Sequence, residues 1–142
     1  MTTQSTPPAK PVPLPTNRAH TRPFWEAAKR HELVLPRCKR CTRYHFYPRE
    51  QCPYCLSPEL EWVPASGRAN LYSYTIIHQP AHPAFQADVP YVYAIVQLIE
   101  GVLMPSNIVD VQIPEGLRMD MPLQAVFDDI SPDWTLVKFR PA

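Results

Sequence analysis

Four cysteines, Cys38, Cys41, Cys52 and Cys55, carry the clearest chemistry in this chain. They form two close pairs, and in each pair two thiolates can approach one tetrahedral ion from the same side. The spacing predicts a metal site, and it leaves zinc and iron open because both accept four thiolates. Four protein ligands leave no position for water or substrate, so we expect the ion to be structural. Zn²⁺ is the predicted ion.

Basic side chains crowd the same stretch of sequence: Arg37, Lys39, Arg40, Arg43 and Arg49. The guanidinium group of arginine and the ammonium group of lysine both bind phosphate groups, so these residues could form a phosphate site. The alternative is that they form a solvated face that aids solubility. Residues 1–59 hold ten Lys or Arg against four Asp or Glu, whereas residues 60–142 hold four against nine. Net charges of +6 and −5 predict two surfaces with different partners.

A proline-containing segment, residues 78–91, includes His78, His82 and Phe85. Its composition is typical of an ordered binding loop, and we assign the three residues to contact with a substrate or partner. A histidine without a visible nucleophile or orienting carboxylate is more often structural, so we name no catalytic residue.

An acidic cluster, Asp128, Asp129 and Asp133, could serve acid–base chemistry or bind a divalent cation. The neighbouring Ser131-Pro132 favours a turn between two strands instead. The chain contains neither a glycine-rich phosphate loop nor a nucleophile elbow.

The elements that must position these residues are mainly strands. The chain has 142 residues, 45% of them apolar, which suits one compact unit, and 19 prolines against 3 glycines disfavour an all-helical fold. We expect a flexible proline-rich arm over residues 1–22, a helical segment over 23–33, a zinc ribbon over 34–63 and a barrel over 64–142. Within the helical segment, the sequence predicts a helix from Pro23 to about Glu32. A helix this short must dock on the core or on another subunit, and docking on the core is favoured.

Five runs rich in β-branched and aromatic residues follow the ribbon: Leu71 to His78, Tyr91 to Ile99, Val102 to Val111, Leu123 to Phe127 and Trp134 to Phe139. Five strands after a ribbon predict a small barrel. Alternation within the first run predicts that Leu71, Ser73, Thr75 and Ile77 share one face. Pro105 predicts a bulge or break within the third run.

The predicted compartment is the cytoplasm, because no apolar run is long enough to cross a bilayer and Met1 to Lys10 lacks the apolar stretch of a secretory signal. Thiols stay reduced there, which favours metal ligation over disulfides.

The order of these pieces resembles a known family. The residues that carry the resemblance are Pro23-Phe24-Trp25-Glu26, the ribbon from Cys38 to Cys55, Gly67-Arg68 before Tyr72-Ser73-Tyr74-Thr75, Pro90-Tyr91-Val92, Asn107-Ile108-Val109-Asp110 and Lys138-Phe139-Arg140-Pro141. Together they resemble the zinc-ribbon and OB-fold family of acyl-CoA-associated proteins, formerly catalogued as a domain of unknown function. The resemblance covers about residues 22–142.

The resemblance implies a mainly β fold: an N-terminal helical segment, a rubredoxin-like zinc ribbon and a five-stranded OB-fold barrel. It also implies an accessory subunit, not catalytic alone, that binds CoA thioesters in a hetero-oligomer. Its partner is then a thiolase-superfamily enzyme, such as a thiolase or steroid side-chain aldolase, or an enoyl-CoA hydratase. The four cysteines match the family's metal ligands.

Two other functions stay open at this point. Ribbons and OB barrels both bind single-stranded nucleic acid, although the acidic barrel half disfavours a groove that follows a phosphate backbone. A self-sufficient hydrolase or lyase could use His78 or the cluster at Asp128. It would turn over acyl-CoA alone, whereas an accessory subunit would be inert without its partner.

Overall fold

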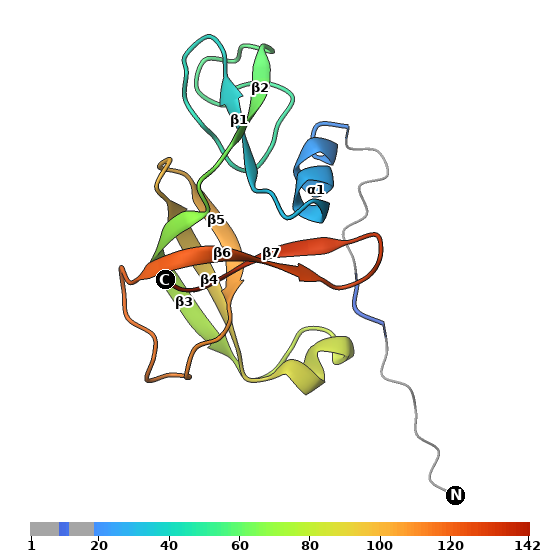
Figure 1. Ribbon diagram of the computed structural model, residues 1–142, viewed down its shortest axis with the longest axis vertical. Coiled ribbons are helices and arrows are strands. Elements are labelled where there is room, and N and C mark those ends of the chain that lie inside the picture. Colours follow the sequence, from blue (N-terminus) through green and yellow to red (C-terminus); the bar gives the residue numbers. More distant parts are fainter. Residues whose placement is uncertain (1–8, 12–18) are drawn as a thin grey trace, which may run out of the picture.

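The computed structural model describes residues 9–11 and 19–142, so most of the predicted arm lies outside the described residues. The small ribbon lies above the barrel in Figure 1 and is built on two antiparallel strands, β1 (Val34–Cys38) and β2 (Leu60–Pro64). Gly67, with a φ of 80°, lies between the ribbon and the barrel. A Cβ atom at Gly67 would lie 2.9 Å from the Gln124 side chain, so this turn requires glycine.

The barrel consists of β3 (Arg68–Ile77), β4 (Tyr91–Leu98), β5 (Leu103–Ile108), β6 (Pro122–Asp129) and β7 (Thr135–Pro141). These strands close in the order β3-β4-β5-β7-β6, which confirms the predicted five-stranded OB-type barrel. The closure is narrow between β5 and β7, because these parallel strands pair only at Ile108 and Phe139. A short 3-10 helix, η1 (Pro83–Asp88), joins β3 to β4.

The core of the barrel follows the strand alternation. Val92, Ala94, Val96 and Leu98 of β4 are all buried, and they pack in one cluster with Phe139 of β7. Leu33 and Leu35 from the start of the ribbon belong to the same cluster, so the ribbon and the barrel share part of one core.

A bulge in β3 changes which residues face the core. The register against β4 shifts between Leu71 and Ser73, so the inward positions change from Leu71 before the bulge to Tyr74 and Ile76 after it. The prediction that Leu71, Ser73, Thr75 and Ile77 share one face is therefore wrong, because one extra residue at Tyr72 reverses the alternation.

Pro105 neither bulges nor breaks β5, contrary to the prediction. Its strand keeps a continuous register against β4 from Leu103 to Ile108, with Pro105 opposite Ile95. Proline is accepted here because the β5 backbone pairs with β7 only at Ile108, so the backbone of Pro105 needs no N–H donor on that side.

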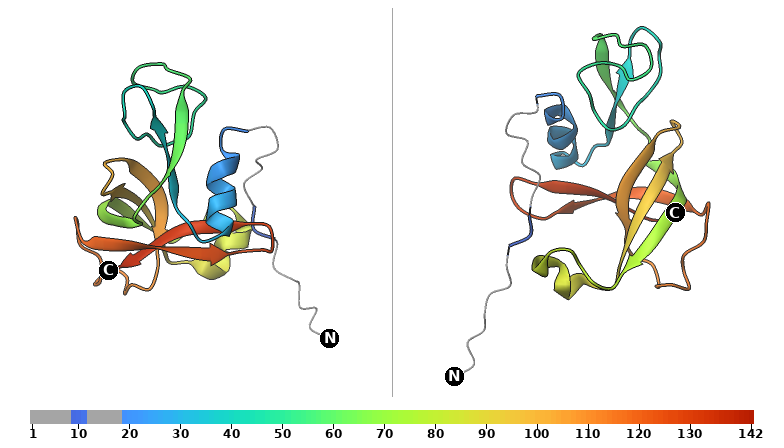
Figure 2. Two further views of the ribbon diagram at one scale, coloured as in Figure 1. Left: turned by 45° about the horizontal axis from the view of Figure 1, so that its top comes forward. Right: turned by 180° about the vertical axis from the view of Figure 1, so that it is seen from behind.

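The helix α1 (Arg22–Lys29) begins one residue earlier than predicted and ends before Glu32. It ends at Lys29 because the chain turns at the next residues, where His31 adopts a φ of 61°. Figure 2 shows α1 beside the ribbon and next to the β6–β7 hairpin. Phe24 packs on Phe46 of the ribbon, with ring centroids 5.8 Å apart, so the predicted docking of the helix on the core is confirmed.

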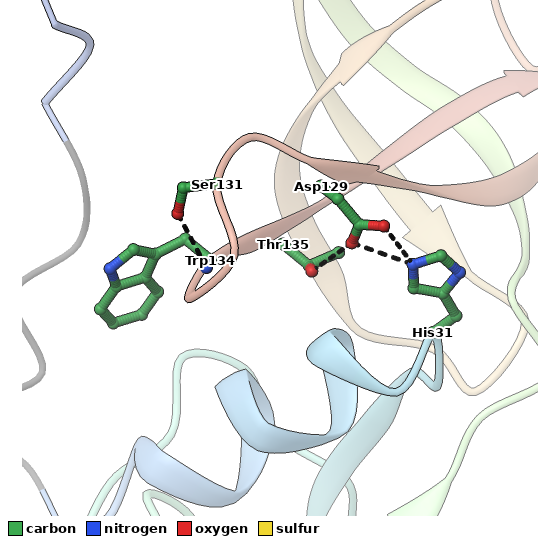
Figure 3. Close-up of polar contacts among 5 residues, drawn as sticks. All are labelled: His31, Asp129, Ser131, Trp134 and Thr135. Carbon is green, nitrogen blue, oxygen red and sulfur yellow. Dashed lines mark hydrogen bonds and ion pairs between the residues drawn. The ribbon is translucent and has the colours of Figure 1, made fainter.

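The hairpin between β6 and β7 confirms the turn interpretation of the acidic cluster. The backbone N–H of Trp134 donates to the Ser131 hydroxyl at 3.1 Å. In Figure 3 the His31 ring faces the Asp129 carboxylate, at 2.9 and 3.0 Å from its two oxygens, and the Thr135 hydroxyl donates to the same group. Asp129 thus links the residues after α1 to the barrel.

Candidate functional site

The four cysteines meet at one point in the ribbon. Their sulfur atoms all lie within 4.8 Å of one another, with Cys38 and Cys55 at 3.5 Å and Cys41 and Cys52 at 3.6 Å. A tetrahedral zinc ion with Zn–S bonds of about 2.3 Å separates its sulfurs by roughly 3.8 Å. Donor type, number and spacing therefore fit a structural zinc.

In each knuckle a backbone N–H points at the first of the two cysteine sulfurs. The N–H of Cys41 points at the sulfur of Cys38, and the N–H of Tyr54 points at the sulfur of Cys52, each at 3.4 Å. The hydrogen bond from Cys41 lowers the pKa of Cys38 to about 6. Zinc bound here would crosslink the two halves of the ribbon, with no ligand position left for a substrate.

His45 lies inside the ribbon without belonging to the cysteine cluster. It is 2% exposed, and neither ring nitrogen has a hydrogen-bond partner among the described residues. Burial, followed by the charge of Arg49, lowers the pKa of His45. The ring is therefore held neutral within the ribbon.

The basic residues do not form one cradle. Arg37 donates to the Thr42 carbonyl at 3.1 Å and lies over Tyr44, whereas Arg43 lies over Tyr54 with its guanidinium carbon 4.8 Å from the ring centroid. The remaining three are exposed: Lys39, Arg40 and Arg49. Arg43 and Arg49 line different hollows of the surface.

A groove crosses the barrel where β5 and β7 separate. Two hollows of about 320 and 490 Å³ form it, and both are lined by Tyr93, Asn107, Leu136 and Lys138. We call this feature the β5–β7 groove. The smaller hollow lies against α1 and the ribbon and has mostly apolar walls, which include Trp25. The larger hollow continues toward η1.

The predicted loop contributes one residue to this groove. Phe85 lines the larger hollow and lies 6.4 Å from the Tyr91 ring, measured between centroids. His82 instead begins η1, where its Nδ1 atom accepts the backbone N–H of Ala84 at 3.0 Å. His78 is exposed just after β3. The structure therefore places Phe85, but neither histidine, in the lining of the groove.

A charged pair gives the groove its polar centre. The Lys138 ammonium donates to the Asp128 carboxylate at 2.6 Å, and Lys138 lines both hollows. Asn107 donates to the Val92 carbonyl at 2.9 Å, which fixes the orientation of its side chain. A ligand would meet mainly apolar walls in the smaller hollow, whereas the larger hollow also presents the Asn107 amide and two ion pairs, Lys138–Asp128 and Lys10–Asp88.

The sequence did not single out most of these lining residues. The strand pattern places Tyr93 and Leu136 in ordinary strands, and Lys138 belongs only to one of the family motifs. The signal in the sequence was the apolar stripe of Phe24, Trp25 and Ala28 on a short helix, because such a stripe must pack against another surface.

The described part of the chain contains no helix long and apolar enough to span a membrane.

Comparison with known families identifies both parts of the structure. Residues 25–61 match the rubredoxin-like zinc ribbon domain of ChsH2, and residues 62–128 match its C-terminal OB-fold domain. Among solved structures, the chain is similar to one of the Ltp2-ChsH2(DUF35) aldolase, with 36% identity and a TM-score of 0.80 over 90% of this chain and 98% of that one.

Two curated relatives extend the comparison. A probable enoyl-CoA hydratase alpha subunit of Thermomonospora curvata is 40% identical over 84% of this chain, which spans only 37% of that protein. A DUF35 domain-containing scaffold protein of Methanocaldococcus jannaschii is 38% identical, and the match covers 77% of each chain. The chain therefore belongs to the DUF35 family, in which a rubredoxin-like zinc ribbon precedes an OB-fold domain.

Proposed function

We propose that this chain is an acyl-CoA-binding accessory subunit, not catalytic alone, of a thiolase-superfamily enzyme or an enoyl-CoA hydratase. The observation that carries the proposal is the β5–β7 groove, whose apolar hollow of about 320 Å³ suits an acyl chain. Its walls come from α1, the ribbon and the barrel together. The similarity of the chain to a hydratase alpha subunit, a scaffold protein and an aldolase supports an enzyme partner.

The two ends of a CoA thioester have opposite needs. The acyl chain needs a dry surface, which the groove offers beside Trp25 and Leu136. The nucleotide end needs cations, and the ribbon supplies five within thirteen positions: Arg37, Lys39, Arg40, Arg43 and Arg49. In this proposal the zinc keeps the ribbon folded, so that the cations stay beside the barrel.

The contacts of two histidines, His82 and His31, support a role without catalysis. His82 holds the start of η1, and His31 donates to Asp129, so each ring is engaged in a structural contact. The reaction would then belong to the partner, while Phe85 and the groove contact the acyl group or the partner's surface.

The test is co-purification of the tagged chain with its enzyme subunit, followed by acyl-CoA kinetics of the complex. We expect Leu136→Trp, which fills the groove, to raise KM for acyl-CoA about tenfold. The matched control is Leu103→Trp on β5, because Leu103 is exposed and does not line the groove. We expect the control to keep the KM of the unaltered complex.

Two results would contradict the proposal. Equal KM values for the two tryptophan variants would remove the groove from substrate binding. Recovery of RNA or DNA that dissociates in salt, with no enzyme subunit, would favour the nucleic-acid function, which the exposed Tyr72 and Tyr93 rings on the barrel could serve by stacking.

A further inference from the structure

A short piece of the N-terminal arm, residues 9–11, lies against η1 at one end of the β5–β7 groove. Figures 1 and 2 show this segment beside η1 in views from opposite sides of the molecule. Lys10 lines the larger hollow of the groove, together with Phe85 and Asp88 of η1. One wall of the hollow therefore comes from a part of the chain that is remote in sequence from the barrel strands.

Lys10 makes two contacts with η1. Its ammonium lies 2.7 Å from the Asp88 carboxylate and 5.7 Å from the centroid of the Phe85 ring. The carboxylate offers an opposite charge, and the face of the ring carries partial negative charge, so both groups attract the ammonium. The side chains of Lys10 and Asp88 stay 43% and 40% exposed. An ion pair this exposed is weak alone, so stable docking needs a further contribution.

The sequence around Lys10 lowers the entropy cost of docking. Lys10 precedes Pro11, and a residue before proline is restricted to extended conformations. Five prolines lie within the first fifteen residues, and proline-rich segments lose little freedom when they bind aromatic-lined grooves. The η1 end of the groove is aromatic, since Phe85, Tyr91 and Tyr93 line it. The composition of the arm therefore matches the lining of the groove.

The arm also sets the charge of the larger hollow. Four ionised side chains line this hollow: Lys10, Asp88, Asp128 and Lys138. They form two ion pairs, so their charges sum to zero. Without Lys10 the same lining would carry one net negative charge, which would repel an anionic ligand. Lys10 therefore keeps the hollow neutral.

We propose that the proline-rich arm docks on η1 through Lys10 and completes the larger hollow as a site for an anionic ligand. The docking is argued from the contacts of Lys10 with Asp88 and Phe85 and from the prolines of the arm. The identity of the ligand as a CoA thioester rests on the proposed function. The docking and the ligand are therefore tested separately.

The docking is tested by NMR spectroscopy of the full zinc-loaded chain. We expect Lys10→Gln to shift the amide signals of η1 and to lower the heteronuclear NOE of the Ala9 amide, because the arm is released. Salt at about 1 M should move the same signals in the unaltered chain, since the screening length falls to about 3 Å. The matched control is Lys29→Gln, which removes the same charge from an exposed residue of α1 outside the hollow. Signals of η1 that respond equally little to both changes would overturn the docking.

The ligand site is tested by calorimetric titration of the same chain with decanoyl-CoA. We expect Lys10→Gln to raise Kd about threefold, because the hollow gains a net negative charge, whereas Lys29→Gln should leave Kd unchanged. Equal Kd values for the two variants would overturn the contribution of the arm to the site. Failure of the unaltered chain to bind the probe would overturn the ligand site as well. In each case the co-purification and KM measurements would decide the accessory function separately.

Discussion

The zinc ribbon and the barrel are stabilised in different ways. The ribbon has two five-residue strands, and its two fully buried cysteines, Cys38 and Cys52, belong to the metal cluster. The barrel instead buries large apolar side chains such as Leu71 and Phe139 completely. A module as small as the ribbon cannot bury enough apolar surface to fold alone, so we expect its stability to depend on zinc and that of the barrel on packing.

Loss of a zinc ligand should have the largest effect and should be confined to the ribbon. Zinc contributes roughly 10–16 kcal/mol in zinc-finger peptides. We expect Cys52→Ser to release the metal and to accelerate hydrogen exchange over residues 34–64, while β4 and β5 stay protected. Mass-spectrometric hydrogen exchange and zinc quantification measure both effects.

The control for this change is Ser57→Ala, which removes a buried hydroxyl that accepts the Glu59 N–H but leaves all four thiols. It should retain zinc. Equal loss of protection in ribbon and barrel after Cys52→Ser would show that the shared cluster at Leu33 and Leu35 joins them into one cooperative unit.

A cavity in the barrel should have the next largest effect, with the metal retained. Leu71 is fully buried, so Leu71→Ala should lower the free energy of unfolding by about 2–5 kcal/mol. Leu103→Ala makes the same truncation at an exposed site and should change it by about 0.5 kcal/mol or less. Urea unfolding gives both values. A comparable loss in the two variants would contradict the assignment of Leu71 to the core.

The smallest effect concerns the contact that ties the segment between α1 and the ribbon to the barrel. Hydrogen bonds from Thr135 and then His31 lower the pKa of Asp129, so its carboxylate stabilises the folded state above the ordinary aspartate value of about 3.9. That stabilisation is lost as the pH falls through the lowered pKa. We expect Asp129→Asn to lower Tm by a few degrees or less near pH 7.

The difference between Asp129→Asn and the unaltered chain should disappear at pH values below the lowered pKa. Asp133→Asn is the matched control, because Asp133 is exposed in the same hairpin and its carboxylate takes part in none of the described contacts. A Tm difference for Asp129→Asn that is constant with pH would attribute the effect to packing rather than to the carboxylate charge.

The two regions also differed in how they could be predicted. Ligand spacing identified the ribbon, since Cys-x2-Cys pairs have few other uses in a reduced chain. Composition and alternation identified the five strands, but the bulge at Tyr72 could not be predicted because it depends on the pairing of β3 with β4. The prediction for Pro105 was wrong for the same reason, since only the strand pairing shows that the β5 backbone meets β7 at a single residue and leaves the edge at Pro105 unpaired.

The candidate site was predicted less completely than the fold. Phe85 lies in the β5–β7 groove as its loop composition suggested, whereas Tyr93 and Lys138 meet there only because β4 and β7 are neighbours of β5. The five basic residues are close in sequence, yet Arg43 and Arg49 turn to different hollows. The ribbon is irregular, so the direction in which its side chains point follows neither the helix nor the strand repeat and cannot be predicted from sequence spacing.

Pro105 has a consequence for aggregation. The separation of β5 from β7 leaves an unpaired strand edge, and such an edge is a template on which a second chain can add a strand. Proline at the middle of β5 offers no N–H to that incoming strand and interrupts the ladder it would need. The edge of β5 beside the β5–β7 groove is thus protected against intermolecular β-sheet growth.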